Sequence, residues 1–262
     1  MNTTFVQNAT PVTINPALTT TVMGYPVFSG KLDQLSMGSQ TPLLINTMSP
    51  NSYGLAQRDP LFEKSLKNCD VLTLDGIGVA LGSLLLNGKN IKKIAGADTF
   101  DYLAAYFNQR GGRCFFVGST EATLQKIVAQ LAKDFPRLEA DYYSPPYKDE
   151  LTAEDSAPII ARINAFKPDV VFVGMSAPKQ EKWAYQNKPY LNTKVIATIG
   201  NVFDWYAGNS KRPAKIWITL RLEWLVRIFH RPEIFRRNTG NQLVFLKDML
   251  LCFTRLKKIS ND

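Results

Sequence analysis

The chain of 262 residues is 45% apolar, which is enough to bury one substantial hydrophobic core. Its three cysteines (Cys69, Cys114 and Cys252) are odd in number, far apart and without a CxxC spacing, which argues against a disulfide framework or a zinc site and favours a reducing compartment. Residues 211–262 hold twelve Lys/Arg and four Asp/Glu, a balance of +8 that leaves only +1 of the net +9 for the preceding residues and predicts an anionic partner for this segment.

Residues 1–24 are rich in Thr, Asn and Pro, a composition that predicts a flexible N-terminal tail. They lack the positively charged start, the continuous apolar stretch and the small-residue cleavage site of a secretory signal. We therefore expect the folded domain to begin near residue 25.

Short apolar runs alternate with longer segments of helical spacing through residues 25–210. The runs predict strands at Leu43–Asn46, Val71–Leu74, Cys114–Val117, Val170–Val173 and Val195–Ile199. The intervening segments predict helices at Ser52–Leu66, Gly78–Leu86, Asp98–Asn108, Glu121–Phe135, Ala153–Phe166 and Lys179–Tyr190. This alternation predicts a single α/β domain with a mostly parallel, Rossmann-like sheet flanked by helices.

Small, flexible or hydrogen-bonding residues follow every predicted strand. The stretches are Thr47-Met48-Ser49-Pro50, Asp75-Gly76-Ile77-Gly78, Gly118-Ser119-Thr120, Gly174-Met175-Ser176-Ala177-Pro178 and Gly200-Asn201. Because ligands of open α/β sheets bind beyond the carboxyl ends of the strands, these stretches favour a nucleotide-diphosphate site at that edge. The alternative for any one loop is a tight strand-to-helix turn without a ligand.

After Gly208 the strand pattern ends, and two helices are expected at Pro213–His230 and Asn241–Lys258. The first is basic and amphipathic, whereas Lys247, Asp248 and Arg255 interrupt the second well before the roughly 20 apolar residues of a spanning helix. Residues 211–262 therefore predict a helical appendage that lies on a membrane without crossing it. A solvated basic face or a nonspecific nucleic-acid patch is the alternative.

The only histidine, His230, lies in this basic segment, which excludes Ser-His-Asp, Cys-His and histidine-rich metal sites. The chain also lacks an Asp-x-Asp pair for a divalent ion, so we expect neither a metal nor a cofactor. A carboxylate must then serve as base, and Asp75 is best placed because it directly follows an apolar strand and precedes Gly76. Its alternative role is a helix N-cap, and Asp98 is even more easily one.

Further polar candidates open a helix at the same edge or lie in the basic segment. Lys179, Gln180 and Glu181 begin the helix after the fourth predicted strand. Gln180 and Glu181 are candidates to form hydrogen bonds with a sugar or a base. The alternatives are that Glu181 only stabilises the positive end of the helix and that Lys179 is solvated. The arginines around Pro232 match phosphate oxygens, and they are Arg227, Arg231, Arg236 and Arg237.

Taken together, these stretches resemble the WecG/TagA/CpsF glycosyltransferase family, also called glycosyltransferase family 26. The matching stretches lie in family order over roughly residues 25–240: INTMSPNSYGLAQRDPLF, DVLTLDGIGVAL, KKIAGADTFDYL, CFFVGST, VVFVGMSAPKQEKW, ATIGNVFDWYAGNSKRPAK and LRLEWLVRIFHRPEIFRR. The resemblance implies a metal-independent, inverting transferase that uses a UDP-sugar, extends an undecaprenyl-diphosphate-linked sugar at the cytoplasmic membrane face, and closes its site with the C-terminal appendage.

The resemblance assigns roles to individual residues. The proposed base of the family falls on Asp75, its pocket threonine on Thr47 and its pocket glutamine on Gln180, while Arg227 and Arg237 match appendage arginines. Three positions depart from the family pattern: Ser49 replaces an asparagine, Lys93 replaces an arginine, and Ile234 replaces a third arginine, for which Arg231 or Arg236 are substitutes. These departures suggest a different sugar or acceptor.

The resulting hypothesis is a peripheral hexosyltransferase at the cytoplasmic face of the plasma membrane, active in surface or exopolysaccharide synthesis. We expect its partners to be a UDP-sugar, a polyprenyl-diphosphate-linked sugar and an anionic membrane surface. We expect no nucleic-acid partner, and the hypothesis is compatible with a homo-oligomer. The predicted catalytic residues are Asp75, Arg227 and Arg237, and the predicted substrate-binding residues are Thr47, Ser49, Lys93, Gly118, Gly174, Lys179, Gln180, Glu181, Asp204, Arg212 and Arg231. A nonenzymatic nucleic-acid or anionic-membrane-binding protein is the alternative, and a glycoside hydrolase is disfavoured because it needs two carboxylates.

Overall fold

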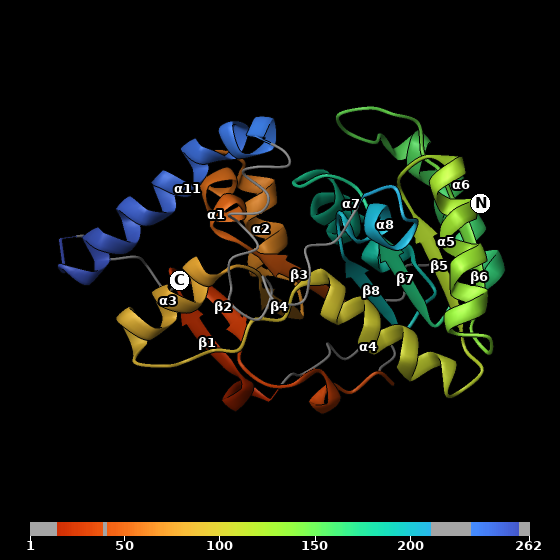
Figure 1. Cartoon of the computed structure of the whole chain (residues 1–262), viewed down its shortest axis with the longest axis horizontal. Coiled ribbons are helices and arrows are strands. Elements are labelled where there is room, and N and C mark those ends of the chain that lie inside the picture. The colour runs from red at the N-terminus through yellow and green to blue at the C-terminus, as the bar shows by residue number, and fades with distance from the viewer. Residues whose placement is uncertain (1–14, 39–40, 211–231, 257–262) are drawn as a thin grey trace, which may run out of the picture.

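The computed structural model describes residues 15–38, 41–210 and 232–256, with backbone only for Ile77 and residues 232–237. One sheet of eight strands runs through the molecule in the order β1-β2-β4-β3-β8-β7-β5-β6 (Figure 1). The strands are β1 (Thr19–Val22), β2 (Tyr25–Phe28), β3 (Leu43–Met48), β4 (Val71–Leu74), β5 (Arg113–Val117), β6 (Glu139–Tyr143), β7 (Val170–Val173) and β8 (Val195–Thr198). Only the β1–β2 pair is antiparallel, which confirms the mostly parallel Rossmann-like fold.

The sequence predicted the five central strands, and it missed β1, β2 and β6. The edge strand β6 is polar and only half-buried, so it lacks the apolar run that marks a buried parallel strand. The predicted tail over residues 1–24 ended too late, because Thr19–Val22 pairs with Tyr25–Phe28 through a turn in which Met23 and Gly24 have positive φ. The four consecutive β-branched residues Thr19–Val22 favour a strand over the tail that composition suggested.

Helices connect the strands much as predicted, with three differences: one predicted helix is divided, the C-terminal helix begins earlier, and the short helix Val202–Tyr206 was not predicted. The helices are α1 (Pro50–Ala56), α2 (Pro60–Lys67), α3 (Ile77–Asn87), α4 (Gly96–Asn108), α5 (Glu121–Asp134), α6 (Ala153–Phe166), α7 (Lys179–Asn187), α8 (Val202–Tyr206) and α11 (Pro232–Phe253), with 3-10 turns at Pro16–Leu18, Leu32–Gln34 and Lys188–Tyr190. The helix expected over Ser52–Leu66 is two helices, because Asp59 caps a new helix that begins at Pro60. Helix α11 begins at Pro232, before the predicted Asn241, and the helix expected at 213–230 lies outside the described residues.

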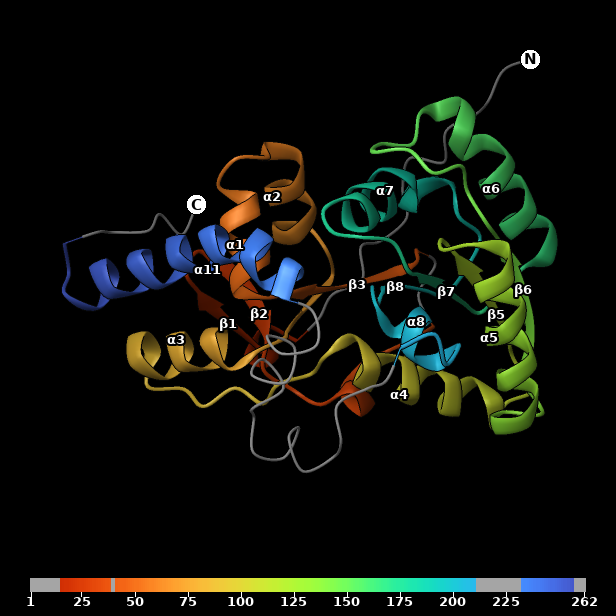
Figure 2. The ribbon, with the colours of Figure 1, turned by 45° about the horizontal axis from the view of Figure 1, so that its top comes forward.

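The central strands are buried on both faces, so neighbouring residues of one strand enter different clusters. Phe116 packs with α4, α5 and α8, whereas Phe115 packs with α6 and α7 on the opposite face. Figure 2 shows these helices as two layers with the sheet between them. This double cover explains why the strands are continuous apolar runs.

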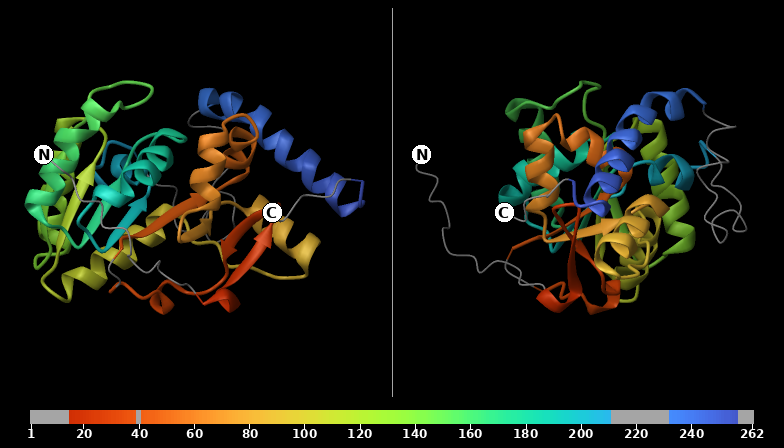
Figure 3. Two further views of the ribbon diagram at one scale, coloured as in Figure 1. Left: turned by 180° about the vertical axis from the view of Figure 1, so that it is seen from behind. Right: turned by 90° about the vertical axis from the view of Figure 1, so that its left-hand side faces the viewer.

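A third cluster lies at the β1–β2–β4 end of the sheet and includes the C-terminal helix α11. Phe245 is fully buried there beside Tyr53 and Val79, and the Tyr53 hydroxyl donates to Asp248 at 2.8 Å. A methyl group on Gly54 would lie 2.5 Å from the Cα atom of Asn241, so α1 and α11 are in close contact (Figure 3). Helix α11 thus packs against the α/β domain through Phe245 and Met249. Within the described ranges, no helix is long and apolar enough to cross a membrane.

Candidate active site

The strand order places a topological switch point at the carboxyl ends of β3 and β8. After β3 the chain turns toward β4, and after β8 it turns toward α8, so the connections leave these neighbouring strands on opposite sides. Such a switch point is where open α/β sheets bind ligands. The loop before α4 crosses this edge, because Gly96 lies so close to β8 that a methyl group there would be 2.8 Å from the carbonyl oxygen of Ile199.

Asp75 lies at this edge, directly after β4. Its backbone N–H donates to the carbonyl oxygen of Met48 at 2.7 Å, which joins the loop to the end of β3. Its carboxylate is 33% exposed and lies 3.3 Å from the amino group of Lys93. The N-cap of α3 is Gly76, and no side chain caps this helix. The alternative that Asp75 serves as the N-cap is therefore wrong, and its carboxylate is accessible to a ligand. Asp98, in contrast, accepts from the backbone N–H of Ala95 and stabilises the start of α4.

Thr47 and Ser49 lie on the same edge as Asp75, at the end of β3. The hydroxyl oxygens of Thr47 and Thr73 are 3.0 Å apart, since these residues are paired on neighbouring strands. Ser49 is the N-cap of α1 and accepts from the backbone N–H of Ser52 at 3.1 Å. Our prediction missed Thr73, although its hydroxyl group within the apolar run Val71–Leu74 was a signal.

Gln180 joins the ends of two strands and is itself buried. Its side-chain oxygen accepts from the backbone N–H of Gly200 at 3.0 Å and from that of Met175 at 3.3 Å. Its side-chain amide donates to Glu181 at 2.8 Å. The exposed fraction is 6% for Gln180 and 2% for Glu181. Gln180 thus connects the loops after β7 and β8.

Glu181 is an unusual buried carboxyl group. One of its oxygens accepts from Gln180, and the other has no hydrogen-bond partner within the described part of the chain. Burial raises the pKa of Glu181 to about 7, because a charge loses its hydration in the interior. It contacts Gln180 and no open surface, so the structure places it behind the site.

We predicted that Gly118 and Gly174 allow a ligand to approach the backbone closely. In the structure, both glycines instead allow close packing of protein atoms. A methyl group on Gly118 would lie 2.4 Å from the carbonyl oxygen of Gly174, and one on Gly174 would lie 2.5 Å from the ring of Phe203. Gly118 also has a φ of +121°, which favours glycine. The space that these glycines leave is therefore filled by protein.

The remaining predicted residues lie around the edge or outside the described ranges. The amino group of Lys179 donates to the carbonyl oxygen of Lys148 at 2.5 Å, and Asp204 lies half-buried on α8. Arg212, Arg227 and Arg231 lie outside the described residues, as does the side chain of Arg237. In the described part of the chain, no group of three or more His, Cys, Asp or Glu residues is arranged to hold a metal ion.

The fold and this edge define a Rossmann-like α/β protein in which the partly exposed carboxylate of Asp75 lies beside Lys93 at the carboxyl ends of the strands. The family model for the "Glycosyl transferase WecG/TagA/CpsF family" matches residues 21–259. The chain therefore belongs to this family of glycosyltransferases, as the sequence motifs predicted.

Individual relatives agree with this assignment. The chain is 30% identical over 210 residues to the N-acetylglucosaminyldiphosphoundecaprenol N-acetyl-beta-D-mannosaminyltransferase of Bacillus spizizenii, with 80% of each chain covered. A protein of the same name from Bacillus subtilis is 31% identical over 194 residues, with 74% of each chain covered. A third, from Staphylococcus aureus, is 26% identical over 189 residues and covers 72% of each chain.

Proposed function

We propose that this protein transfers a hexose or N-acetylhexosamine from a UDP-sugar to a sugar carried on undecaprenyl diphosphate, with inversion at the anomeric carbon. The family and the names of its relatives support the reaction class, since those relatives act on N-acetylglucosaminyldiphosphoundecaprenol. The observation that carries the proposal is the carboxylate of Asp75, which lies directly after β4, is accessible and is not used to cap a helix.

Asp75 is the general base in this proposal. An acceptor hydroxyl oxygen forms a bond to the anomeric carbon while the bond from that carbon to UDP breaks on the opposite face. UDP departs with the bonding electron pair, and the proton of the hydroxyl passes to Asp75. A carboxylate is a weak base for an alcohol, so this proton transfer contributes about 10²–10⁴-fold in rate, as the proton becomes acidic in the transition state.

Cations must stabilise the departing diphosphate, since the proposal includes no metal. Lys93 is the described cation beside Asp75, at 3.3 Å. Arg227 and Arg237 of the C-terminal segment are proposed to supply further positive charge to the departing diphosphate. Thr47 and Ser49 are proposed to bind the donor. Oriented positive groups at a leaving group lower the barrier because they need no reorganisation during the reaction.

The acceptor's lipid tail requires the reaction to occur at a membrane, which we propose is the cytoplasmic face of the plasma membrane. Helix α11 suits this peripheral role, because Leu243, Leu250 and Phe253 are each more than half exposed. The basic residues of positions 211–262 would favour anionic lipid. Assembly of the site at the membrane would limit hydrolysis of the donor.

A donor screen tests this proposal. The full chain is incubated with UDP-glucose, UDP-N-acetylmannosamine and related UDP-sugars together with short-chain polyprenyl-diphosphate sugars, and products are identified by mass spectrometry. We expect one donor to give a product extended by one sugar, with release of one UDP, and nuclear magnetic resonance to show inverted anomeric configuration. Absence of transfer with every donor, together with steeply salt-dependent nucleic-acid binding, would favour the nonenzymatic alternative.

A further inference from the structure

Helix α3 presents apolar side chains to solvent although it belongs to the α/β domain. Its sequence from Ile77 to Asn87 contains no charged residue. Leu81, Leu84 and Leu85 are 43%, 48% and 42% exposed, and their spacing places them on one side of the helix. The opposite side is packed, since Gly82 and Ser83 are buried. A solvent-facing helix surface ordinarily carries charged residues, so this one favours another environment.

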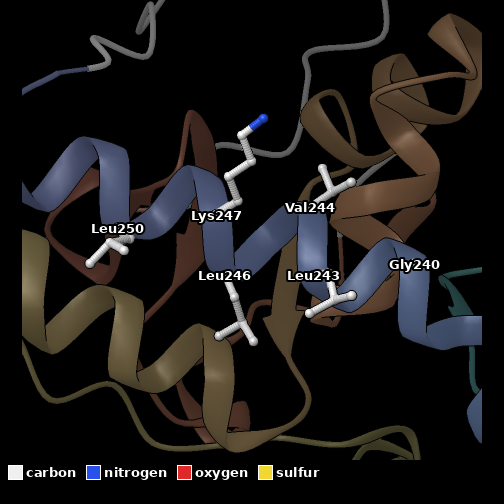
Figure 4. A pocket seen from close by; sticks show the side chains of 6 residues that line it. All are labelled: Gly240, Leu243, Val244, Leu246, Lys247 and Leu250. Atoms are coloured by element: carbon white, nitrogen blue, oxygen red, sulfur yellow. The ribbon is translucent and has the colours of Figure 1, made fainter.

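Helix α11 extends this apolar surface. It lies against α3, where Gly82 approaches both Phe245 and Met249. Figure 4 shows Leu246 and Leu250 on the side of α11 that faces α3 in this view, with Lys247 pointing to the other side. We define the α3–α11 face as the exposed side chains of Leu81, Leu84, Leu85, Leu246, Leu250 and Phe253. Two helices from distant parts of the sequence thus contribute to one surface.

The exposed charged residues that directly follow α3 are lysines. Residues 76–97 include Lys89, Lys92 and Lys93 and no Asp or Glu, and the first two lysines are exposed. On α11, Asp248 is buried and accepts from the Tyr53 hydroxyl, so its charge does not border the surface. An exposed apolar helix surface that is followed in the chain by exposed lysines complements a bilayer surface with acidic headgroups.

We propose that the α3–α11 face enters the headgroup region of an anionic membrane, so that α3 binds lipid together with α11. This inference rests on the proposed function, because a lipid-linked acceptor provides the reason for membrane contact. Helix α3 begins directly after Asp75 and Gly76. Contact of α3 with lipid would hold Asp75 at the depth of the acceptor's diphosphate group.

The test uses the full chain with Leu84→Glu and Leu85→Glu combined. Its control combines Tyr190→Glu with Asn192→Glu, which adds the same charge at exposed positions. These positions precede β8 and therefore lie at the amino ends of the strands, whereas α3 begins at the carboxyl ends. Binding is measured by co-sedimentation with vesicles of phosphatidylglycerol and phosphatidylcholine. We expect at least about tenfold weaker binding for the α3 variant, because two leucines are lost from the apolar contact, and unchanged binding for the control.

Two transfer assays accompany the vesicle measurement. Transfer to an acceptor embedded in vesicles should fall with vesicle binding, whereas transfer to a short-chain, water-soluble acceptor should stay within about twofold of the parent. Thermal unfolding checks that the variant is folded, and Leu81→Glu provides a second variant on the same face. If vesicle binding weakens as expected but neither parent nor variants transfer any sugar, the membrane inference stands and the proposed function fails.

Vesicle binding equal to the parent in both α3 variants would overturn the inference, whatever the transfer rates. A second copy of the chain is the competing occupant of this face. Analytical ultracentrifugation distinguishes this case. The parent would be a dimer, whereas the α3 variants would be monomers that still bind vesicles. That outcome would also overturn the membrane inference.

Discussion

The polar side chains after β4 and after β7 follow equally buried strands, yet their environments differ. Asp75 is 33% exposed and has Lys93 as its charged neighbour. Gln180 and Glu181 are almost completely buried and bond to the protein. A polar residue at the carboxyl edge of a sheet can therefore either remain accessible to a ligand or hold neighbouring loops together.

The two regions also differ in what surrounds them. The β4 region is covered by α3 and α11, which expose leucines, whereas the β7 region is packed under helices that enclose Trp183 and Phe203. Chemistry and membrane contact are thus proposed for one half of the molecule, and rigidity for the other. Four substitutions sharpen or break this division, ordered from the largest expected change in stability to the smallest.

Phe245→Ala should lower the free energy of unfolding by about 3–5 kcal/mol, because a fully buried ring in the cluster beneath α11 is lost. Urea unfolding followed by circular dichroism measures this loss. Leu250→Ala, on the same helix but 61% exposed, is the control and should cost less than about 1 kcal/mol. Equal, small losses in both variants would show that α11 is not part of the folded core.

Glu181→Gln should change how stability depends on pH. The pKa of Glu181 is raised from 4.5 to about 7, so the folded state favours the protonated form. The stabilising contribution is therefore complete below pH 4.5 and is lost as pH rises through about 7. The glutamine variant cannot ionise and should exceed the parent by up to about 3 kcal/mol at pH 8, with little difference at pH 4. Urea unfolding at each pH measures the stability of both proteins. If the two stabilities depended on pH in the same way, the raised pKa of Glu181 would be contradicted.

Gln180→Ala should lower the free energy of unfolding by about 1–3 kcal/mol, because the backbone N–H groups of Met175 and Gly200 lose their acceptor. Hydrogen exchange should accelerate at both amides, which urea unfolding alone would not reveal. Gln109→Ala, at an exposed helix end, serves as the control. Unchanged exchange at Gly200 would show that Gln180 does not hold the loop.

Lys93→Met should change the free energy of unfolding by less than about 1 kcal/mol, because its ion pair with Asp75 is a third exposed at both ends. If Lys93 meets the departing diphosphate, kcat/KM for transfer should nevertheless fall at least about tenfold. Lys93→Arg keeps the charge and should retain most of the activity. A large loss of stability without loss of transfer would assign Lys93 a structural role.

The sequence predicted the parts of the fold that depend on local pattern. Buried parallel strands such as Val170–Val173 are recognisable because both of their faces require apolar residues. The edge strand β6 and the β1–β2 hairpin carry no such run, so they became evident only through their pairing with neighbours.

The candidate site was predictable in position but only partly in role. Asp75 and Thr47 lie at the carboxyl edge of the sheet as predicted, Asp75 directly after β4 and Thr47 within β3, one residue before its end. The burial of Gln180 and Glu181 depends on how the loops after β7 and β8 meet, and one sequence holds no local signal for that contact. The packing of Gly174 against Phe203 is likewise a tertiary contact.

The single-turnover rate of sugar transfer by Asp75→Asn tests the role of Asp75 most directly, with UDP binding and thermal unfolding measured on the same preparation. Asparagine keeps the shape of the side chain but cannot accept the proton. The account predicts a folded protein that binds UDP within about threefold of the parent and transfers sugar about 10²–10⁴-fold more slowly. A transfer rate near that of the parent would contradict it and would remove Asp75 from the role of base.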